Sequence, residues 1–276
     1  MFQDNGLRRR WWLYLILSVA LIVVVTPFVW MVLGAFKTSS ELRKVPPTWL
    51  PENPTLENFT SLFSRLSFDT YFLNSTLVAV AVTVGNLLFC SMVGYALAML
   101  NFRGKKLVFG LIMATLMIPG VVTFVPLFVL VANMGLVNTL PGLILPFLVG
   151  PFGVFLMRQF IMGLPKDLVE AARIDGAGEL KIFARIILPL LGPAMATLGI
   201  LTFLGSWNNF LWPLVVAQTN DTYTLPVALA LYSTGQNQTE YGLLMAGATV
   251  VVLPVLVVFL IFQRRFIQGI ATTGIK

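Results

Sequence analysis

The chain has 276 residues, of which 58% are apolar and only 11% charged, and its net charge at pH 7 is +7. A soluble domain carries about 25% charged residues, so this composition excludes an ordinary soluble globule. Histidine is absent and Cys90 is the only cysteine. These absences exclude histidine-based catalysis, a histidine or cysteine metal site and an intrachain disulfide framework.

Long stretches without charged residues predict membrane-spanning helices, because about 20 apolar residues cross the hydrocarbon core of a bilayer. A lipid-facing barrel would instead show short alternating segments. We therefore expect residues 1–276 to form one all-α membrane domain. Its six predicted spans cover residues 11–35, 71–99, 107–132, 139–158, 188–217 and 241–263.

The basic residues indicate how these spans are oriented. By the positive-inside rule, loops rich in Lys and Arg face the cytoplasm. Four basic residues, Lys37, Arg43, Lys44 and Arg65, lie on one side and the other fourteen on the opposite side. Both termini are therefore predicted in the cytoplasm, with outside loops at residues 37–70 and 218–240. The positive charge describes topology and gives no reason to expect nucleic-acid binding.

The second and third spans contain a predicted break and two polar side chains, the features that a route for a solute would need if the protein is a transporter. Pro119-Gly120 lies about 12 residues from the cytoplasmic start of the third span, so a break near the bilayer midplane is expected there. Such breaks let backbone groups face a cavity. Asn86 and Tyr95 on the second span are polar candidates for the same route, although each also fits ordinary hydrogen bonding between helices.

The energy source for transport is not evident in this chain. Apart from Arg158, the last residue of the fourth, no predicted span contains Asp, Glu, Lys or Arg, and the phosphate-binding pattern G-x-x-x-x-G-K-[ST] is missing. Titratable groups at membrane depth cost roughly 3 kcal/mol each and mark proton or ion routes. A proton-coupled carrier is therefore disfavoured, and uphill transport would need energy from another chain. A sodium site made of carbonyl groups stays open.

The predicted cytoplasmic loop 159–188 has the most specific pattern. The run Leu164-Pro165-Lys166-Asp167 is typical of a helix start. Gly176 stands where a left-handed residue would end this helix, about ten residues long. A second short amphipathic segment, residues 179–187, follows. The apolar positions on one side of the first helix are Leu168, Ala171 and Ala172.

These residues resemble, position for position, the E-A-A-x3-G-x9-I-x-L-P signature of the membrane subunits of binding-protein-dependent ABC importers. The resemblance implies a type I importer permease fold, in which this loop forms coupling helices that seat in a cleft of an ATPase subunit. A solvated loop helix is the plain alternative. The matching residues are Glu170, Ala171, Ala172, Gly176, Ile186, Leu188 and Pro189, with Asp175 beside them as a further contact candidate.

The fifth span carries the sharpest candidates for solute contact. Indole faces stack on sugar rings and amides pair with hydroxyl groups, which favours Trp207, Asn208, Asn209 and Trp212. Trp207 lies about 27 Å beyond Pro189 along a helix, however, where interfacial aromatic belts ordinarily sit. Both roles therefore stay open.

Three further segments are similar to the sugar-transporting branch of the family, in particular to the six-span partner of the two unlike permeases in maltose-type systems. The resemblance covers the whole chain and implies a bacterial cytoplasmic membrane protein that imports a mono-, di- or oligosaccharide. The alternatives are a permease for glycerol phosphate or another polyol, a stand-alone secondary carrier and a membrane enzyme. The three segments are Phe36–Phe59, Ser206–Leu214 and Gln263–Lys276.

The resemblance also implies an assembly. The partners would be a second, different permease, two ATPase subunits and an extracytoplasmic sugar-binding protein. ATP and Mg would bind on the ATPase subunits, so this chain would need no cofactor and catalyse no reaction. The tail is expected to contact the ATPase subunits through Gly269, Gly274 and Lys276.

Overall fold

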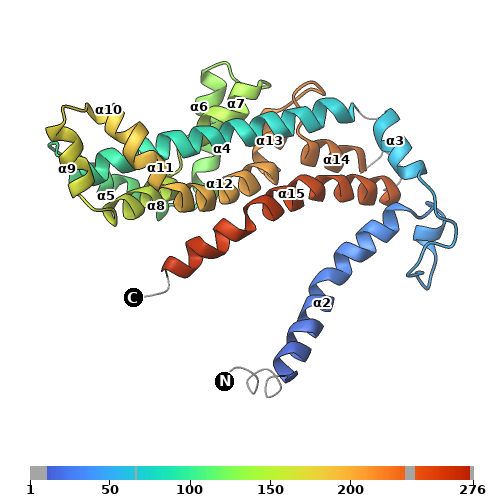
Figure 1. Ribbon diagram of the computed structural model, residues 1–276. Coiled ribbons are helices and arrows are strands. Elements are labelled where there is room, and N and C mark those ends of the chain that lie inside the picture. Colours follow the sequence, from blue (N-terminus) through green and yellow to red (C-terminus); the bar gives the residue numbers. More distant parts are fainter. Residues whose placement is uncertain (1–10, 66, 234–239, 274–276) are drawn as a thin grey trace. The chain divides into compact units, whose positions relative to one another are not determined.

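The computed structural model describes residues 11–65, 67–233 and 240–273 (Figure 1). Within these ranges every regular element is a helix, as the composition predicts. The chain divides into two compact units. One comprises Met1–Phe68 with Leu229–Leu253, and the other comprises Asp69–Ala228 with Pro254–Lys276.

Three helices are long and apolar enough to cross a membrane without interruption. They are α2 (Trp11–Ala35), α4 (Phe68–Met99) and the Tyr241–Ile261 part of α15 (Tyr241–Thr273). These helices confirm the first, second and sixth predicted spans as helices. The last continues to Thr273, beyond its predicted end at residue 263.

Three further candidate spans are pairs of helices with a bend between them. The bend between α5 (Lys105–Leu116) and α6 (Gly120–Asn133) is 106°. It confirms the break predicted at Pro119-Gly120, although the turn is close to a right angle. The second pair, α7 (Leu140–Ile144) with η2 (Leu145–Phe147) and then α8 (Pro151–Met162), bends by 41°.

The prediction of one helix over residues 188–217 is wrong. Helix α12 spans only Gly192–Trp207 and is bent by 80° from the preceding segment Glu179–Leu190. Pro193 in its first turn explains the bend, because proline has no N–H to bond the carbonyl four residues earlier. The short helix α13 (Leu211–Val216) follows after a second break.

The first unit contains two short helices, η1 (Glu41–Arg43) and α3 (Glu57–Arg65), within the predicted outside loop 37–70. The buried Asn58 amide donates to the carbonyls of Ala35 and Lys37, at 2.8 and 2.7 Å. Lys37 is itself buried, and its ammonium lies 4.8 Å from the Trp30 ring centroid. These contacts fix the chain where it leaves α2.

The predicted outside loop 218–240 is not a simple polar connector. It contains α14 (Leu225–Ser233), in which Leu225, Val227 and Ala228 are fully buried. The apolar run is too short for a span, but it is long enough for a buried helix of about two turns. Residues 234–239 of the loop lie outside the described residues.

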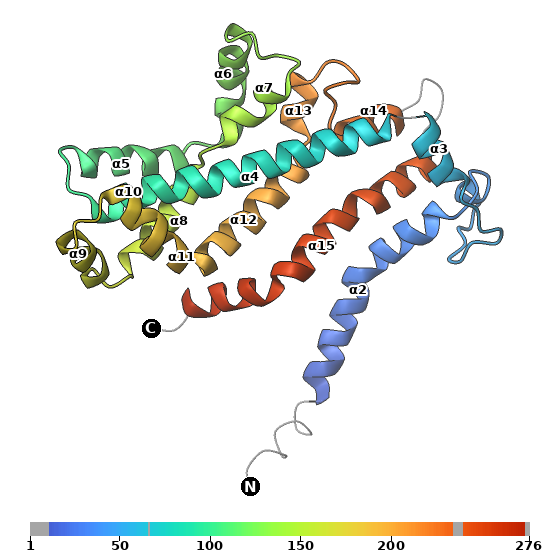
Figure 2. The same cartoon turned by 45° about the horizontal axis from the view of Figure 1, so that its top comes forward.

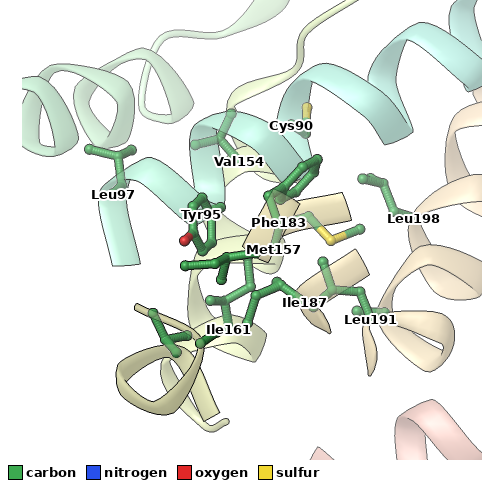
Figure 3. Packing of buried hydrophobic residues seen from close by; sticks show 14 residues of the cluster. Cys90, Tyr95, Leu97, Val154, Met157, Ile161, Phe183, Ile187, Leu191 and Leu198 are labelled. Atoms are coloured by element: carbon green, nitrogen blue, oxygen red, sulfur yellow. The ribbon is translucent and has the colours of Figure 1, made fainter. Parts of the chain in front are cut away.

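Helix α4 runs the length of the second unit (Figures 1 and 2), with α5, α9 (Asp167–Ile174) and α10 (Glu179–Ile182) near its C-terminal end. Its backbone lies close to α8, because a Cβ at Gly94 would lie 2.8 Å from the Met157 Cβ. A Cβ at Gly153 would likewise lie 2.7 Å from the Cys90 sulfur. The core that fills this region is shown in Figure 3.

Candidate functional site

Helix α9 ends at Ile174, and Gly176 is the left-handed residue that the sequence predicts after it. This glycine has φ of +76°. Its N–H donates to the Arg173 carbonyl at 3.0 Å, and the Ala177 N–H donates to the Ala172 carbonyl at 2.9 Å. This pair of bonds is the Schellman arrangement, which satisfies the last carbonyls of the helix and reverses the chain. The left-handed residue is therefore part of a defined turn between α9 and α10.

The buried side of α9 is not the apolar side that its sequence predicts. Val169 and Ala172 are buried against the core, whereas Leu168 and Ala171 are exposed. The buried pair has i, i+3 spacing, so it forms the inner face of this short helix. Exposed apolar side chains continue beyond Leu168, at 42% exposure, to Ile174 at 86% and Leu180 at 75%.

Glu170 and Asp175 are exposed on the same loop. The later residues of the signature have a different environment. Ile186 and Leu188 are partly buried against the core cluster, and only Pro189 is exposed. The early part of the matched pattern thus presents a surface, while its later part anchors the loop to the unit.

The segment between α10 and α12 includes a wide helical turn. Residues Phe183–Ile187 form the π-helix η3, and α11 (Leu188–Leu190) completes the approach to the bend. Phe183 and Ile187 are both buried. The sequence predicts a helical segment over residues 179–187, which is confirmed, but its hydrophobic spacing gives no sign of the wider turn.

One carboxylate joins both loop helices to the end of α4. Glu179, in the first turn of α10, accepts a hydrogen bond from the Tyr95 hydroxyl at 2.5 Å and from Arg173 Nε at 2.8 Å. The Arg173 guanidinium and then the Tyr95 hydroxyl hold the pKa of Glu179 below its ordinary value. Tyr95, predicted on the solute route, is therefore placed against the loop.

A cavity of about 390 Å³ lies in the second unit, between α4, the α7–α8 region and the α12–α13 region. Volumes of this order are typical of small-molecule sites. None of the described residues that line it is charged. Of the predicted route residues, Asn86, Asn209 and Trp212 line it. The other lining residues are Val78, Val82, Leu143, Pro146, Phe147, Val149, Gly150, Pro151, Thr202, Gly205, Ser206 and Pro213.

The sequence reasoning missed the two hydroxyl groups of this cavity. Thr202 and Ser206 are four residues apart on α12, so they share one face of the helix. Asn209 follows three residues later. The spacing 202, 206 and 209 was a usable signal, because it extends one polar helix face into the break after Trp207.

The two tryptophans differ in their relation to the cavity. The Trp212 indole donates to the Gly142 carbonyl at 3.1 Å and makes T-shaped ring contacts with Phe124 and Phe147. Trp207 is buried, and its ring stacks on Phe203 without lining the cavity. Within this chain, therefore, Trp207 is a packing residue and Trp212 forms a wall.

Asn208 and the break at Pro119-Gly120 also lie away from the cavity lining. The Asn208 amide donates to the Leu204 carbonyl of its own helix at 2.9 Å. A Cβ at Gly120 would meet no atom within 4 Å. Its neighbours Met117 and Val121 are 85% and 84% exposed, so this chain leaves the break open.

Asn138, in the turn before α7, bonds to the end of α13 and the loop after it. This residue has φ of 59°, and its N–H donates to the Val216 carbonyl at 2.8 Å. Its side-chain oxygen accepts from the backbone N–H groups of Gln218 and Thr219, at 2.9 and 3.1 Å, and from the Thr222 hydroxyl at 2.5 Å. Asn138 thus ties the turn before α7 to the loop after α13.

Helix α4 contacts the same loop directly. The Asn74 amide donates to the carbonyls of Asp221 and Tyr223, at 2.9 and 3.0 Å, and the Ser75 hydroxyl accepts from the Leu225 N–H at 2.7 Å. Of the predicted tail contacts, Gly274 and Lys276 lie outside the described residues. Gly269 lies in α15, where only the backbone is described.

Comparison with known proteins finds one matching family and several similar proteins. Residues 90–272 match the family described as binding-protein-dependent transport system inner membrane component. The chain is 44% identical over 257 residues to an arabinooligosaccharides transport system permease protein of Halalkalibacterium halodurans, covering 92% of each chain. It is 37% identical to a diacetylchitobiose uptake system permease protein of Streptomyces coelicolor, covering 92% of this chain and 84% of that protein.

Two further similarities bear on solute and fold. An sn-glycerol-3-phosphate transport system permease protein of Escherichia coli is 32% identical, with 93% of each chain covered. A chain from a bacterial ABC transporter involved in the import of the acidic polysaccharide alginate superposes with a TM-score of 0.85 at 22% identity. That match covers 96% of this chain and 99% of the other. The fold is therefore that of an ABC importer permease.

Proposed function

The chain belongs to the family of binding-protein-dependent transport system inner membrane components, and from this premise we propose that it carries a neutral sugar across the bacterial cytoplasmic membrane. As a permease subunit it is a multi-pass membrane protein. The observation that carries the proposal is the cavity between α4 and α12, which offers amide, hydroxyl and indole groups without a charged side chain. Such groups suit a polyhydroxylated, uncharged solute.

The main alternative solute is glycerol phosphate or another polyol, since a relative carries that name. A phosphate would favour an arginine or lysine at the site. No basic residue lines the cavity among the residues that the structure describes, which favours the neutral solute.

The α9–α10 loop is the proposed docking surface for an ATPase subunit. Its exposed Leu168, Ile174 and Leu180 would be covered on docking, and the exposed Glu170 would pair with a donor in the cleft. The assembly we propose comprises this chain, a second and different permease, two ATPase subunits and an external binding protein. ATP and Mg would bind on the ATPase subunits, with both termini of this chain in the cytoplasm.

Purification with a tag on this chain tests the assembly. We expect an ATPase and a second permease to copurify, and liposomes containing the complex to take up solute only with internal ATP and external loaded binding protein. Uptake by the chain alone would contradict the proposal and favour a secondary carrier. Deletion of Thr272–Lys276 is expected to weaken ATPase association.

The solute is tested separately on the same liposomes. The probes are an arabinooligosaccharide, diacetylchitobiose and glycerol 3-phosphate, each presented to the purified binding protein and followed by its thermal shift and by uptake. A neutral sugar should shift the binding protein and be taken up. Uptake of glycerol 3-phosphate without any neutral sugar would overturn the proposed solute class.

A further inference from the structure

We propose that Tyr95 is a positioning residue that links the ATPase-facing loop to the wall of the solute cavity, through its hydrogen bond to Glu179. The inference rests on the proposed role of the loop. The sequence predicts Tyr95 on the solute route, whereas the inference gives it a positioning role.

The first step is the geometry of the junction. Tyr95 donates to one oxygen of the Glu179 carboxylate at 2.5 Å, and Arg173 donates to the other at 2.8 Å. Arg173 lies in the last turn of α9 and Glu179 in the first turn of α10. One carboxylate therefore holds both loop helices and the end of α4, so a movement of the loop reaches Tyr95 directly.

The second step is that packing holds the Tyr95 ring, whereas the partner of its hydroxyl is partly exposed. The ring is buried, lies 5.5 Å from the Phe183 ring centroid and sits in the cluster with Met157 (Figure 3). Close approach of Gly94 to the Met157 backbone leaves α4 little room to slide over α8 at this level. The hydroxyl, in contrast, bonds a glutamate whose side chain is 42% exposed.

The third step joins Tyr95 to the cavity. Asn86, Val82 and Val78 line the cavity and lie on the same uninterrupted helix as Tyr95. Nine residues separate Tyr95 from Asn86, or about 13 Å along the helix axis. Because α4 contains no proline, it joins Tyr95 to this wall as one continuous helix, so a tilt of α4 would reach the wall although the helix has little room to slide over α8.

The bond itself adds little to folding, which separates a positioning role from a stabilising one. The Arg173–Glu179 pair is exposed by about two-fifths, and exposed ion pairs contribute little to stability. The variant Tyr95→Phe keeps the ring and removes only the hydroxyl. We therefore expect it to insert, assemble and retain the ATPase subunits.

The test uses the complete complex in liposomes with loaded binding protein. For Tyr95→Phe and Glu179→Ala we expect transport per ATP hydrolysed to fall by about fivefold or more. The concentration of loaded binding protein that gives half the maximal rate should stay unchanged. The double variant should be no worse than the worse single variant, because both remove the same link. The control Tyr223→Phe removes a hydroxyl that donates to the Gln218 carbonyl and should leave the ratio unchanged.

Two outcomes would overturn the inference. One is that Tyr95→Phe leaves transport per ATP hydrolysed unchanged, and the other is that the losses of the two single variants add fully in the double variant. Failure of the underlying proposal has a different signature. If the loop does not dock an ATPase, Glu170→Lys will leave ATPase attachment and stimulation at native levels, whatever Tyr95→Phe does.

Discussion

The two ends of α4 are held in different ways. Near its start, Asn74 and Ser75 bond the loop after α13, which Asn138 also holds through backbone N–H groups and a hydroxyl. Near its end, the charged Glu179 side chain provides the link to α9 and α10. We call these the Asn138 end and the Glu179 end.

The difference lies in how many bonds must break for movement. At the Asn138 end, the Asn138 oxygen accepts from two backbone N–H groups and a hydroxyl, and Asn74 and Ser75 make three more bonds to the same loop, so movement must break several bonds together. At the Glu179 end, a half-exposed carboxylate exchanges partners with water at small cost. In the proposed orientation, the rigid end faces outside and the adjustable end faces the ATPase.

The largest expected effect is at the Glu179 end, in the turn that presents the loop. Gly176→Val places a β-branched residue at φ of +76°, which costs about 1–3 kcal/mol and tilts α9. We expect transport to be nearly lost and ATP hydrolysis to become insensitive to loaded binding protein, with the chain still bound to its permease partner. Glu170→Lys should produce the same uncoupling.

Gly178→Val is the matched control, because Gly178 has φ of −71° and ψ of 156°, which valine adopts. A Cβ at either glycine would meet no atom within 4 Å, so the comparison isolates backbone strain. Equal activity of the two valine variants would remove the turn from the coupling mechanism.

The Asn138 end should open more easily when the hydrogen-bond acceptor of the Asn138 side chain is removed. Asn138→Gly keeps the left-handed backbone but removes the acceptor of two exposed backbone N–H groups, at about 0.5–1.5 kcal/mol for each bond. We expect several-fold faster modification of Cys90, buried beside the cavity residues Asn86 and Gly150, by a membrane-impermeant thiol reagent. Mass spectrometry of the Cys90 peptide measures the rate.

Asn138→Asp retains the accepting oxygen and a residue that tolerates the left-handed region. Cys90 in this variant should therefore be modified by the thiol reagent at close to the native rate. If the glycine and aspartate variants react equally fast, the side-chain oxygen does not hold this end closed.

A smaller effect is expected in the cavity between the two ends. Asn209→Ala removes a lining amide, and loss of one hydrogen bond to solute costs about 0.5–1.5 kcal/mol. Uptake should fall by roughly twofold to tenfold. Asn208→Ala is the control, because its amide bonds the Leu204 carbonyl and does not line the cavity. A greater loss in Asn208→Ala would place the solute elsewhere.

A substitution at Gly120 tests whether the solute route passes the break between α5 and α6. In Gly120→Leu the new side chain has open space in this chain, and leucine favours the helix more than glycine at the start of α6, so folding should be unharmed. If the solute route passes this break, uptake should nevertheless fall sharply, because the leucine would project into the route. Normal uptake by this variant would exclude the break from the route.

The smallest expected effect is on pH dependence. The lowered pKa of Glu179 means that its ionised bonds contribute fully above the ordinary glutamate pKa and are lost as pH falls through the lowered value. The difference in unfolding midpoint between the native chain and Glu179→Gln should therefore shrink in acid. The corresponding difference for Asn138→Gly should stay constant, because its bonds involve no titratable side chain.

The sequence predicts best what depends on near neighbours. The apolar runs, the break at Pro119 and the left-handed Gly176 follow from local composition and backbone chemistry. The junctions do not, because Tyr95 and Glu179 are 84 residues apart and Asn138 and Gln218 are 80 apart. Tyr95 was therefore predicted on the solute route, and Asn138 was missed.

The fifth span shows the same limit within one element. Its apolar run predicts a helix, but Pro193 and the residues after Trp207 divide it. Whether each aromatic faces solute or core depends on helices distant in sequence, such as α7 for Trp212. Asn209 and Trp212 line the cavity, whereas Trp207 stacks on Phe203 and does not.

The π-helix at Phe183–Ile187 bears on how the chain tolerates changes in length. A wide turn of this kind accommodates one residue more than an α-helix of the same rise. Deleting a residue inside it would close the turn to an α-helix and keep Glu179 and Leu191 on their present faces. The same deletion in α12 would rotate every later residue by about 100°. A one-residue deletion in this turn should therefore disturb the helices after it less than the same deletion in α12.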